Sequence, residues 1–313
     1  MPLSPHWRWK IDRWRERFFS GSGEEKQRRP RLCPACGTLV GSTANRCHQC
    51  GASLTFSMAA MSRSLSKYLP SQSPVTYAIL FACCGLYGLS LLLSVRYGFA
   101  ISPQGGGLGA LFGIGSVGGP VLQRLGASMP LLIDLDQPWR FVTACFLHAN
   151  LMHIVFNMWV LVDLAPTIEE IYGSARFFFI YVATGICGYI LSGFFGHFSI
   201  GASGALVGLI GILLAVTYRS RGGAMLQLRS QLYRWIIYLV LWGFFFPGID
   251  NTAHLGGGIA GFILGRFMVD HQPGSTQERK RAYALGWITG AVVLVSFGFM
   301  IFGFHEHIFF RGF

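Results

Sequence analysis

Charged residues, and acidic ones especially, are scarce in this chain of 313 residues. Only 12% of the residues are charged, with 13 acidic against 25 basic, while 52% are hydrophobic. Soluble proteins average about 25% charged residues, and disordered chains contain few apolar ones. The composition therefore excludes a soluble globular protein and a disordered chain. It favours a polytopic membrane protein with a small polar appendage.

The basic charge is concentrated near the N-terminus. Residues 1–73 hold 12 of the 25 basic residues and four acidic ones, which gives a net charge of 12 − 4 = +8. Such a segment can bind nucleic acid or an anionic membrane surface. Next to hydrophobic spans, it more often marks the cytoplasmic flank that sets the topology. We therefore expect the lipid bilayer as a partner and no nucleic acid.

Seven apolar runs predict membrane-spanning helices. The first runs from Val75 to Val95 without a charged residue, long enough for one crossing at ~1.5 Å per residue. A turn signal at Pro247 and Gly248 favours two short helices over one kinked helix at the fifth and sixth runs. No internal repeat of the kind found in transporters is visible. The runs cover residues 75–95, 149–168, 177–195, 200–218, 235–250, 251–269 and 282–304.

Basic residues between the runs predict the orientation. Two loops are rich in them, the one between the fourth and fifth runs and the one between the sixth and seventh: Arg219, Arg221, Arg229 and Arg234, then Arg279, Lys280 and Arg281. The positive-inside rule puts both groups in the cytoplasm together with the N-terminus, and the C-terminus outside. The sequence thus predicts a multi-pass protein of a plasma or inner membrane. The long segment from Arg96 to Leu147 then lies on the outer side.

Four cysteines near the N-terminus form two C-x-x-C pairs, Cys33 with Cys36 and Cys47 with Cys50. Four thiolates at this spacing can close a tetrahedral zinc site. Two disulfides or redox pairs are the alternative, which a cytoplasmic location disfavours. A module this small has little core of its own, so the metal would supply its folding energy. We predict a structural zinc here, with an unidentified protein as the partner of the module.

Polar residues inside apolar runs are costly in lipid, so they indicate function. His153 and Asn157 are four residues apart and share a helix face. Ser203 lies in a Gly-x-Ser-Gly tetrapeptide at the start of the fourth run, and His254 lies near the start of the sixth. Each alone also fits close helix packing, an interhelical hydrogen bond, or a metal or proton-relay element. All four are near the outer ends of their helices in the predicted topology, so together they predict an active site.

Glycine stripes accompany the serine and the histidine. One stripe follows His254 on its own helix face, and the other lies beside Ser203. They consist of Gly257, Gly261 and Gly265, and of Gly204, Gly208 and Gly211. Small-residue stripes let helix backbones approach closely. We therefore expect the sixth span to pack on the fourth and to bring the imidazole within hydrogen-bond range of the hydroxyl.

The pattern of these residues resembles the rhomboid family of intramembrane serine proteases. The resemblance covers residues 74–270 and includes motifs beyond the four polar residues. These motifs are Gly126-Ala127, Trp139-Arg140, Phe146-Leu147-His148, Glu169, Tyr172-Gly173, Gly201-Ala202-Ser203 and the stretch from Asp250 to Gly257. The resemblance implies structural roles for Trp139, Arg140 and Glu169. It implies a structural or water-holding role for His148.

The fold that the resemblance implies is an all-α polytopic membrane protein. It has a rhomboid-like six-helix core and one extra C-terminal transmembrane helix, and a small N-terminal zinc ribbon precedes the core. The predicted divisions are a basic segment (1–30), a zinc-ribbon-like module (31–52), a linker (53–73), the catalytic core (74–270), and a cytoplasmic loop with the seventh helix (271–313).

The implied activity is cleavage of transmembrane protein substrates by a Ser203–His254 dyad, without a cofactor for catalysis. Ser203 would attack the scissile carbonyl, with His254 as general base and then general acid. The His153 side chain, the Asn157 amide and the backbone N–H of Ser203 would bind the oxyanion. Asp250 lies one helical turn before His254, and we expect it to point outward and to take no part.

One position departs from the family pattern. Four residues after the serine, the family usually carries an aromatic ring against which the catalytic imidazole packs, and here that residue is Val207. A valine gives the imidazole no ring to stack on. This departure favours a catalytically silent rhomboid-like protein that binds membrane clients, whereas the intact Ser203 and His254 favour a protease. A channel or transporter with His153, Asn157 and His254 along a polar path is a third alternative.

Overall fold

The computed structural model describes residues 30–33, 37–41, 44–51, 73–99, 113–219, 222–245 and 248–306. Cys36 lies outside these residues, as do most of the predicted basic segment, most of the predicted linker and part of the glycine-rich stretch from 104 to 119. The described residues divide into two units, one on each side of residue 58. The smaller unit holds a hairpin, and the larger unit holds the helices.

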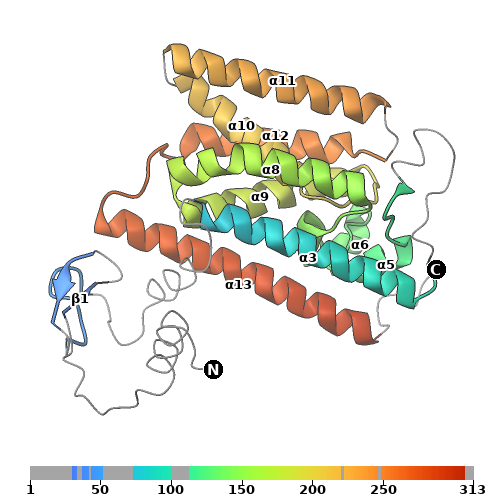
Figure 1. The fold of residues 1–313 in the computed structure, drawn as a ribbon, viewed down its shortest axis with the longest axis horizontal. Helices are drawn as coiled ribbons and strands as arrows, with labels where there is room; N and C mark the ends of the chain where they lie inside the picture. The colour runs from blue at the N-terminus through green and yellow to red at the C-terminus, as the bar shows by residue number, and fades with distance from the viewer. Residues whose placement is uncertain are drawn as a thin grey trace, which may run out of the picture. The chain divides into compact units, whose positions relative to one another are not determined.

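The larger unit is a bundle of helices (Figure 1). Long helices occupy all seven predicted spans, and short elements lie between the first two of them. The long helices are α3 (Pro74–Arg96), α8 (Leu151–Tyr172), α9 (Ser174–Phe194), α10 (Ser203–Arg219), α11 (Gly223–Phe245), α12 (Asn251–Phe267) and α13 (Thr276–Glu306). The short elements are α5 (Gly119–Arg124), α6 (Leu131–Asp136), α7 (Arg140–Thr143) and a 3-10 turn (Ala144–Phe146). The predicted all-α fold is confirmed.

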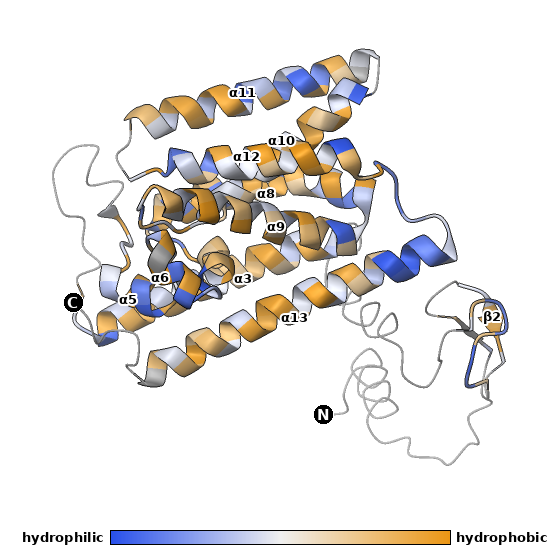
Figure 2. Ribbon diagram, turned by 180° about the vertical axis from the view of Figure 1, so that it is seen from behind, coloured by the Kyte–Doolittle hydropathy of each residue, from blue (hydrophilic) through white to orange (hydrophobic). Residues whose placement is uncertain are grey.

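Four of the described helices are long and apolar enough to cross a membrane, namely α3, α8, α9 and the part of α13 from Thr276 to Phe304. α10 is a shorter apolar helix of 17 residues, and α12 has the same length. Figure 2 shows apolar residues along the long helices and a polar stretch at the start of α13. The helices are those of a multi-pass membrane protein.

The fifth predicted span is wrong in its bounds. The predicted span starts at residue 235, after the last arginine, whereas α11 begins at Gly223 and ends at Phe245. The Arg229 guanidinium donates to the Thr217 carbonyl and lies 4.1 Å from the centre of the Tyr218 ring. Long arginine side chains can reach from an apolar surface to polar partners. The helix therefore runs through charged residues that were expected in a loop.

The packing of α12 on α10 agrees with the expectation from the glycine stripes. These two helices make more extensive contact than any other pair of described elements. A Cβ atom added at Gly257 would overlap the carbonyl oxygen of Gly204. One turn further along, Gly261 meets Gly208 in the same way. Because no side chain separates them, the two backbones touch along these glycines.

The second neighbour of α12 is α9. A Cβ atom added at Gly188 of α9 would lie 2.7 Å from the carbonyl oxygen of Ala253. A Cβ atom added at Gly256 of α12 would lie 2.9 Å from the Cβ atom of Leu191. α12 is therefore held between α9 and α10 by glycine contacts on two of its faces.

Arg140 fixes the segment that precedes α8. Its side chain is buried, and its guanidinium donates to the Gln137 side chain and to the carbonyls of Gln123 and Ala127, at 2.5, 2.8 and 2.9 Å. The guanidinium also lies 4.8 Å from the centre of the Trp139 ring. A buried charge is tolerated only where its N–H groups find partners. These contacts support the structural roles implied for Trp139 and Arg140.

Glu169, near the other end of α8, joins three helices. Its carboxylate accepts from the N–H groups of Val75 and Thr76 at 3.0 and 2.9 Å, and so caps the first turn of α3. It also accepts from the Ser174 hydroxyl at the start of α9, at 2.6 Å. The first N–H groups of a helix have no partner within it, so a carboxylate there is stabilising. The contacts support a structural role for Glu169.

The smaller unit contains a two-stranded antiparallel hairpin, β1 (Arg31–Leu32) and β2 (Leu39–Val40). The register pairs Arg31 with Val40 and Leu32 with Leu39. Val40 packs with Cys33 and Cys47 in a small cluster of buried residues. A cluster of this size provides little of the core that a fold needs.

Candidate active site

Ser203 is the first residue of α10, and hydrogen bonds fix the turn before it. The Gly201 N–H donates to the Ala144 carbonyl at 2.9 Å, and the Gly201 carbonyl accepts from the Tyr189 hydroxyl at 2.5 Å. Gly201 has φ = +123°, a conformation that residues with a side chain rarely adopt. The chain therefore enters α10 from a turn that is held on both sides.

The histidine and asparagine predicted to bind the oxyanion lie on α8 and face this turn. A Cβ atom added at Gly201 would lie 2.5 Å from Nε2 of His153 and 3.7 Å from Nδ2 of Asn157. His153 Nδ1 accepts from the Ala149 N–H at 3.4 Å, so the proton of the neutral imidazole is on Nε2. The Asn157 amide has two protons and donates one to the His153 carbonyl at 2.9 Å. Both side chains can thus present an N–H group beside Gly201.

His254 lies in the first turn of α12, and Asp250 caps that turn. The Asp250 carboxylate accepts from the N–H groups of Thr252 and Ala253, both at 3.0 Å. The His254 N–H donates to the Asp250 carbonyl at 3.2 Å, which is the first backbone bond of the helix. A cap of this kind holds the first turn of a helix in place. The backbone that carries the imidazole is therefore well fixed.

The helix contact brings the Ser203 end of α10 and the His254 end of α12 together. A Cβ atom added at Gly204 would lie 3.5 Å from the Ala253 carbonyl oxygen. These two residues are direct neighbours of Ser203 and His254 in the chain. The predicted site residues thus gather at one end of the bundle, and the direct hydrogen bond between the Ser203 hydroxyl and the His254 imidazole stays a prediction.

Val207 lies at the contact between the two helices that carry Ser203 and His254. It follows Ser203 by one turn, and a Cβ atom added at Gly258 would lie 3.2 Å from its Cγ1 atom. Gly258 in turn follows His254 by one turn. The valine that stands where the family usually has an aromatic residue therefore lies one helical turn from both residues of the expected dyad.

Asp250 does not point outward, contrary to the expectation from the sequence. Its side chain is only 11% exposed, and its second carboxylate oxygen accepts from the Ser192 hydroxyl of α9. Burial raises the pKa of Asp250, but hydrogen bonds from Ser192, Thr252 and Ala253 outweigh burial and lower the pKa to about 2. The position of Asp250 one turn before His254 predicted an outward side chain, whereas the hydroxyl of Ser192, on another helix, binds the carboxylate inside the bundle.

His148 packs against one of the expected oxyanion donors. The rings of His148 and His153 meet edge to face with 5.1 Å between their centres. His148 is fully buried, and within the described part of the chain neither of its ring nitrogens has a hydrogen-bond partner. Its contact supports the structural role, and the water-holding role stays a prediction.

Several polar residues with evident contacts were missed by the sequence reasoning. Three of them are Tyr189, which holds the Gly201 turn, His197, which contacts the α12 cap, and Asp163. Asp163 lies within α8 and accepts from the side chains of Gln231 and Trp235 of α11, at 3.3 and 3.1 Å. An acidic residue in an apolar run is a signal that the sequence does offer. The tyrosine and the loop histidine carry no such signal.

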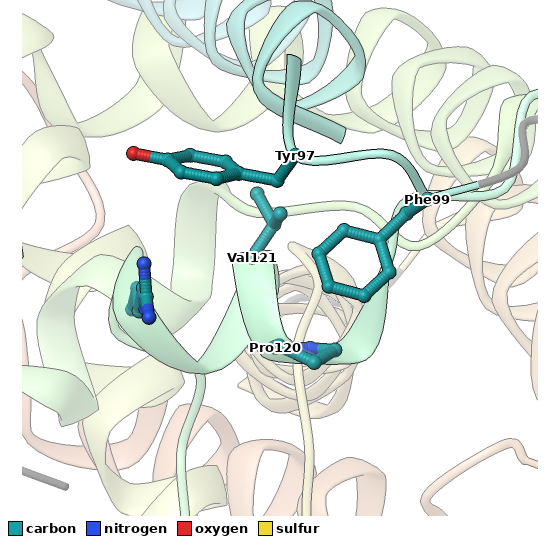
Figure 3. Close-up of a pocket in the computed structure, with 5 residues that line it drawn as sticks. Tyr97, Phe99, Pro120 and Val121 are labelled. Carbon is teal, nitrogen blue, oxygen red and sulfur yellow. The ribbon is translucent and has the colours of Figure 1, made fainter. Parts of the chain in front are cut away.

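A small cavity of about 130 Å³ lies between the end of α3 and the start of α5 (Figure 3). Its lining consists of Tyr97, Phe99, Pro120, Val121 and Arg124. The Arg124 guanidinium lies 5.5 Å from the centre of the Tyr97 ring. None of the expected catalytic residues lines this cavity.

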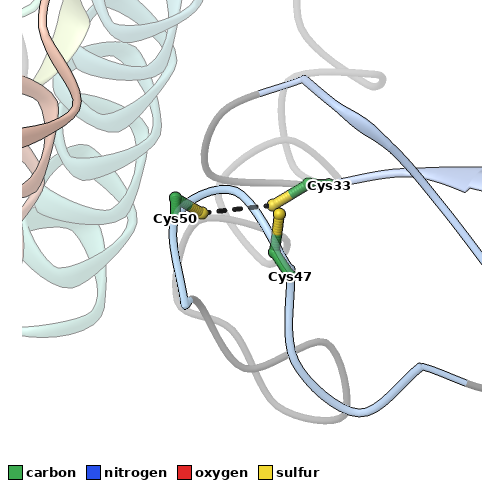
Figure 4. A group of neighbouring side chains, drawn as sticks. All are labelled: Cys33, Cys47 and Cys50. Carbon is green, nitrogen blue, oxygen red and sulfur yellow. Dashed lines mark hydrogen bonds between the residues drawn. The ribbon is translucent and has the colours of Figure 1, made fainter.

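Three of the four predicted zinc ligands lie together in the smaller unit (Figure 4). The Sγ atoms of Cys33, Cys47 and Cys50 all lie within 4.8 Å of one another, and those of Cys33 and Cys50 are 3.7 Å apart. A zinc ion with four sulfur ligands at ~2.3 Å has sulfur–sulfur edges of ~3.8 Å, so these thiols could hold a zinc ion. Cys36, the fourth predicted ligand, lies outside the described residues.

The glycines that follow the two C-x-x-C pairs have the same hydrogen bond and similar φ angles. The Gly37 N–H donates to the Cys33 carbonyl at 2.9 Å. The Gly51 N–H donates to the Cys47 carbonyl at the same distance. Both glycines have positive φ angles, +76° and +68°. The glycine after each C-x-x-C pair thus makes the same hydrogen bond to the first cysteine of its pair, which agrees with a metal site built from two such pairs.

The sequence is similar to known proteins over the helical unit. Residues 135–271 match the family model of the Rhomboid domain. Similar proteins include "Rhomboid protease GluP" of Bacillus subtilis (strain 168), 34% identical over 195 residues, and "Rhomboid-like protease 1" of Toxoplasma gondii, 36% identical over 153 residues. "RHOMBOID-like protein 6, mitochondrial" of Arabidopsis thaliana is 36% identical over 169 residues.

These similarities cover part of each protein. The matched part covers 61% of this chain for the Bacillus protein, 46% for the Toxoplasma protein and 51% for the Arabidopsis protein. They span 37%, 52% and 53% of those relatives. The chain therefore spans about half or less of the length of the curated relatives it matches.

Proposed function

The chain belongs to the rhomboid family, and on this premise we propose that it is an intramembrane serine protease that cleaves transmembrane protein substrates with a Ser203–His254 dyad. One observation carries the proposal: the glycine contact between α10 and α12 sets the helix ends with Ser203 and His254 against each other. The relatives named as rhomboid proteases support the same activity. The proposed reaction uses no cofactor.

In the proposed reaction, His254 takes the proton of the Ser203 hydroxyl while the oxygen attacks the scissile carbonyl carbon. A serine hydroxyl is a weak nucleophile at its ordinary pKa, so an adjacent base is needed. The imidazole then gives this proton to the leaving amine, and an acyl-enzyme forms. A water molecule that the same imidazole activates hydrolyses the acyl-enzyme and frees the serine.

The attack leaves a negative charge on the former carbonyl oxygen, and three N–H groups would stabilise it. They belong to the His153 imidazole, the Asn157 amide and the Ser203 backbone. Donors that are already oriented in a water-poor site stabilise such a charge most effectively. The N-terminus of α10 adds the positive end of the helix dipole. Gly201 leaves the Nε2 edge of His153 uncovered, which supports this assignment.

We also propose that the N-terminus lies in the cytoplasm and the C-terminus outside, in a plasma or inner membrane. Basic residues at the end of α10, in the first half of α11 and in the first turns of α13 support this orientation. Ser203, at the N-terminal end of α10, then lies toward the outer surface. A cysteine introduced at Gly274, labelled by a membrane-impermeant maleimide, checks the orientation. Labelling should require cell lysis, and labelling of intact cells contradicts it.

A fluorophosphonate probe tests the proposed function, because it labels only an activated serine. The purified wild-type protein should be labelled, and Ser203→Ala should not. His254→Ala should lose labelling by about 1000-fold or more, since the nucleophile then lacks its base. Ser296→Ala, which removes a buried serine of α13, is the matched control and should keep the wild-type rate. A wild-type protein that takes no label favours the client-binding alternative, which Val207 supports.

Cleavage of a generic transmembrane substrate extends this test from an activated serine to a protease. The purified protein should release a fragment from the substrate in detergent or liposomes. Ser203→Ala and His254→Ala should release none. Labelling without cleavage would limit the protein to other acyl-transfer chemistry.

We propose further that the smaller unit binds one structural zinc ion through Cys33, Cys36, Cys47 and Cys50. The thiol spacing and the matched glycine turns support this set. With all four positions filled by protein, the ion would stabilise the fold and take no part in catalysis. The unit would then serve as a docking module for an unidentified protein partner.

The zinc content of the purified chain tests this site. Elemental analysis should find about one zinc per chain, as one tetrahedral four-thiolate site holds one ion. Cys47→Ser should lower this content, while Cys187→Ser, in α9, should leave it unchanged. Equal zinc content in the wild type and Cys47→Ser contradicts the assignment.

A further inference from the structure

His197 lies in the loop between α9 and α10, six residues before Ser203. Its Nδ1 atom is 2.9 Å from the Thr252 hydroxyl and 3.4 Å from a carboxylate oxygen of Asp250. Its side chain is 49% exposed and stacks on the Phe195 ring, with 6.5 Å between ring centres. The loop that leads into α10 thus contacts the cap of α12 through one side chain.

The hydrogen bonds around Thr252 define the role of His197. The Thr252 hydroxyl donates its single proton to the Asp250 carboxylate at 2.5 Å. It can therefore only accept from His197, so His197 Nδ1 carries a proton. This proton is present in one neutral tautomer and in the charged form alike. A chain of donors runs from His197 through Thr252 to Asp250.

The loop that carries His197 is also held at its other end. Ser199 pairs with Ser128 through two backbone hydrogen bonds, both at 3.0 Å. The chain then passes through Gly201, whose N–H is bound to Ala144, into Ser203. A contact made by His197 is therefore transmitted along a short and well-fixed stretch of chain to the start of α10.

The glycine contact between α10 and α12 does not by itself fix α12 along and around its axis. Glycine stripes let the two backbones approach closely, but they provide no side chains that interlock. Sliding or rotation of α12 at its first turn is therefore poorly opposed by the stripe itself. Ser192 bonds Asp250 from the side of α9, and His197 bonds the same cap from the side of the loop.

We propose that His197 is a positioning residue for the Ser203–His254 pair. By bonding Thr252 beside Asp250, it fixes the first turn of α12 against the loop that enters α10, and so fixes the imidazole relative to the hydroxyl. This role rests on the proposed function, because it concerns the same reaction. In this role His197 acts through Thr252 and the α12 cap and not on the reacting atoms themselves.

Substitution of His197 tests this role through the separate effects on kcat and KM. His197→Ala should lower kcat for a transmembrane substrate about tenfold with KM unchanged, because a misplacement near 1 Å can cost up to about 100-fold. His197→Asn should recover most of kcat, since its amide N–H can occupy the place of Nδ1–H. His271→Ala, which removes an exposed histidine beyond the far end of α12, should keep the wild-type kcat.

Two substitutions of Thr252 provide a second test of the positioning role. This test is sufficient by itself if His197→Ala does not fold. Thr252→Val keeps the shape of the side chain but loses the hydroxyl, and it should lower kcat as His197→Ala does. Thr252→Ser keeps the hydroxyl and should retain kcat. Unchanged kcat in both His197→Ala and Thr252→Val overturns the role. A loss in His197→Ala that asparagine does not repair also overturns it.

Hydrogen exchange separates a failure of this role from a failure of the proposed function. Exchange in the peptide 250–255 should be slow in the wild type, faster in His197→Ala and slow again in His197→Asn. Equal exchange in the three proteins overturns the link itself. An active wild type with unchanged kcat in the variants overturns the positioning role alone. A wild type that neither cleaves substrate nor takes a fluorophosphonate overturns the proposed function, and the positioning role with it.

Discussion

Gly201 is the residue at which backbone geometry and the expected chemistry meet most closely. Its φ angle of +123° favours glycine, and the His153 imidazole occupies the space that a side chain would need. The φ angle alone, or the lack of space alone, would disfavour any residue other than glycine. Together they tie the shape of the turn to the position of an expected oxyanion donor.

Gly201→Ala should therefore nearly abolish proteolysis, because the added methyl group would displace the His153 imidazole. Loss of one oxyanion donor lowers kcat by about 100- to 1000-fold. Gly196→Ala is the matched control, because Gly196 has φ = +76° in the same loop but nothing within 4 Å of an added Cβ atom. It carries backbone strain of ~1–2 kcal/mol without touching His153. Equal losses of kcat in the two variants contradict the role of His153.

Activity should fall as the pH drops below neutral, because a protonated His254 cannot accept the serine proton. Asp250 does not cause this fall. Its folded-state pKa is lowered to about 2, so its contribution to the α12 cap is complete above the unfolded pKa of ~3.9 and is lost only as the pH falls through about 2.

The rate of fluorophosphonate labelling between about pH 5 and 8 checks this expectation, since a histidine titrates in that range. Circular dichroism over the same range should stay constant, which separates protonation from unfolding. A labelling rate that does not change with pH argues against His254 as the base.

At the scale of helices and loops, apolar runs predicted where the long helices occur but not where they end. α3 and α9 agree with their predicted spans within about three residues, whereas α11 begins twelve residues early. A run of apolar residues marks the part of a helix that lies in hydrocarbon. The apolar run does not predict the first turns of α11, which lie outside it and in which Arg229 bonds the end of α10.

The glycine stripes were the part of the site that the sequence described best. A stripe has a helical period, and its consequence for packing depends only on the size of its residues. The cap of α12 could not be read in the same way. Its partners Ser192 and His197 come from another helix and its loop, 58 and 53 residues before Asp250, and no local pattern connects them.

Gly257→Leu should separate the ends of α10 and α12, because even a Cβ atom at this position overlaps the Gly204 carbonyl. Proteolysis and fluorophosphonate labelling should fall by about 100-fold or more, as expected when reacting groups shift by 1 Å. Gly298→Leu, in α13, is the control, since nothing lies within 4 Å of an added Cβ atom there. Both variants should insert into membranes. Full activity in Gly257→Leu would count against this packing.

For the molecule as a whole, composition was sufficient to predict a membrane protein, and cysteine spacing was sufficient to predict a metal module. The sequence does not predict how the two units are related. Each unit has its own buried cluster of residues. Sequence patterns report on local periodicity and ligand spacing, so they identified each unit but not its partner.

Chelation of zinc should unfold the smaller unit and leave proteolysis by the helical unit intact, because each unit is stabilised by its own contacts. Limited proteolysis would then cleave within residues 31–52 after treatment with a chelator, while release of the substrate fragment continues at the untreated rate. Re-addition of zinc should restore protection. Loss of both protection and activity would show that the two units are coupled.

The shortness of two helices affects the lipid around them. α10 and α12 contain 17 residues each, which at ~1.5 Å per residue gives ~25 Å against a hydrocarbon thickness of ~30 Å. α10 is mostly buried within the bundle, whereas α12 exposes apolar side chains such as Leu255 and Ile259, so a bilayer beside α12 would thin at a cost of fractions of a kcal/mol per Å of mismatch. Short-chain lipids would relieve this deformation. Long-chain lipids would cover the turns where these helices begin with hydrocarbon. The length of the acyl chains would then affect how easily water reaches the expected site.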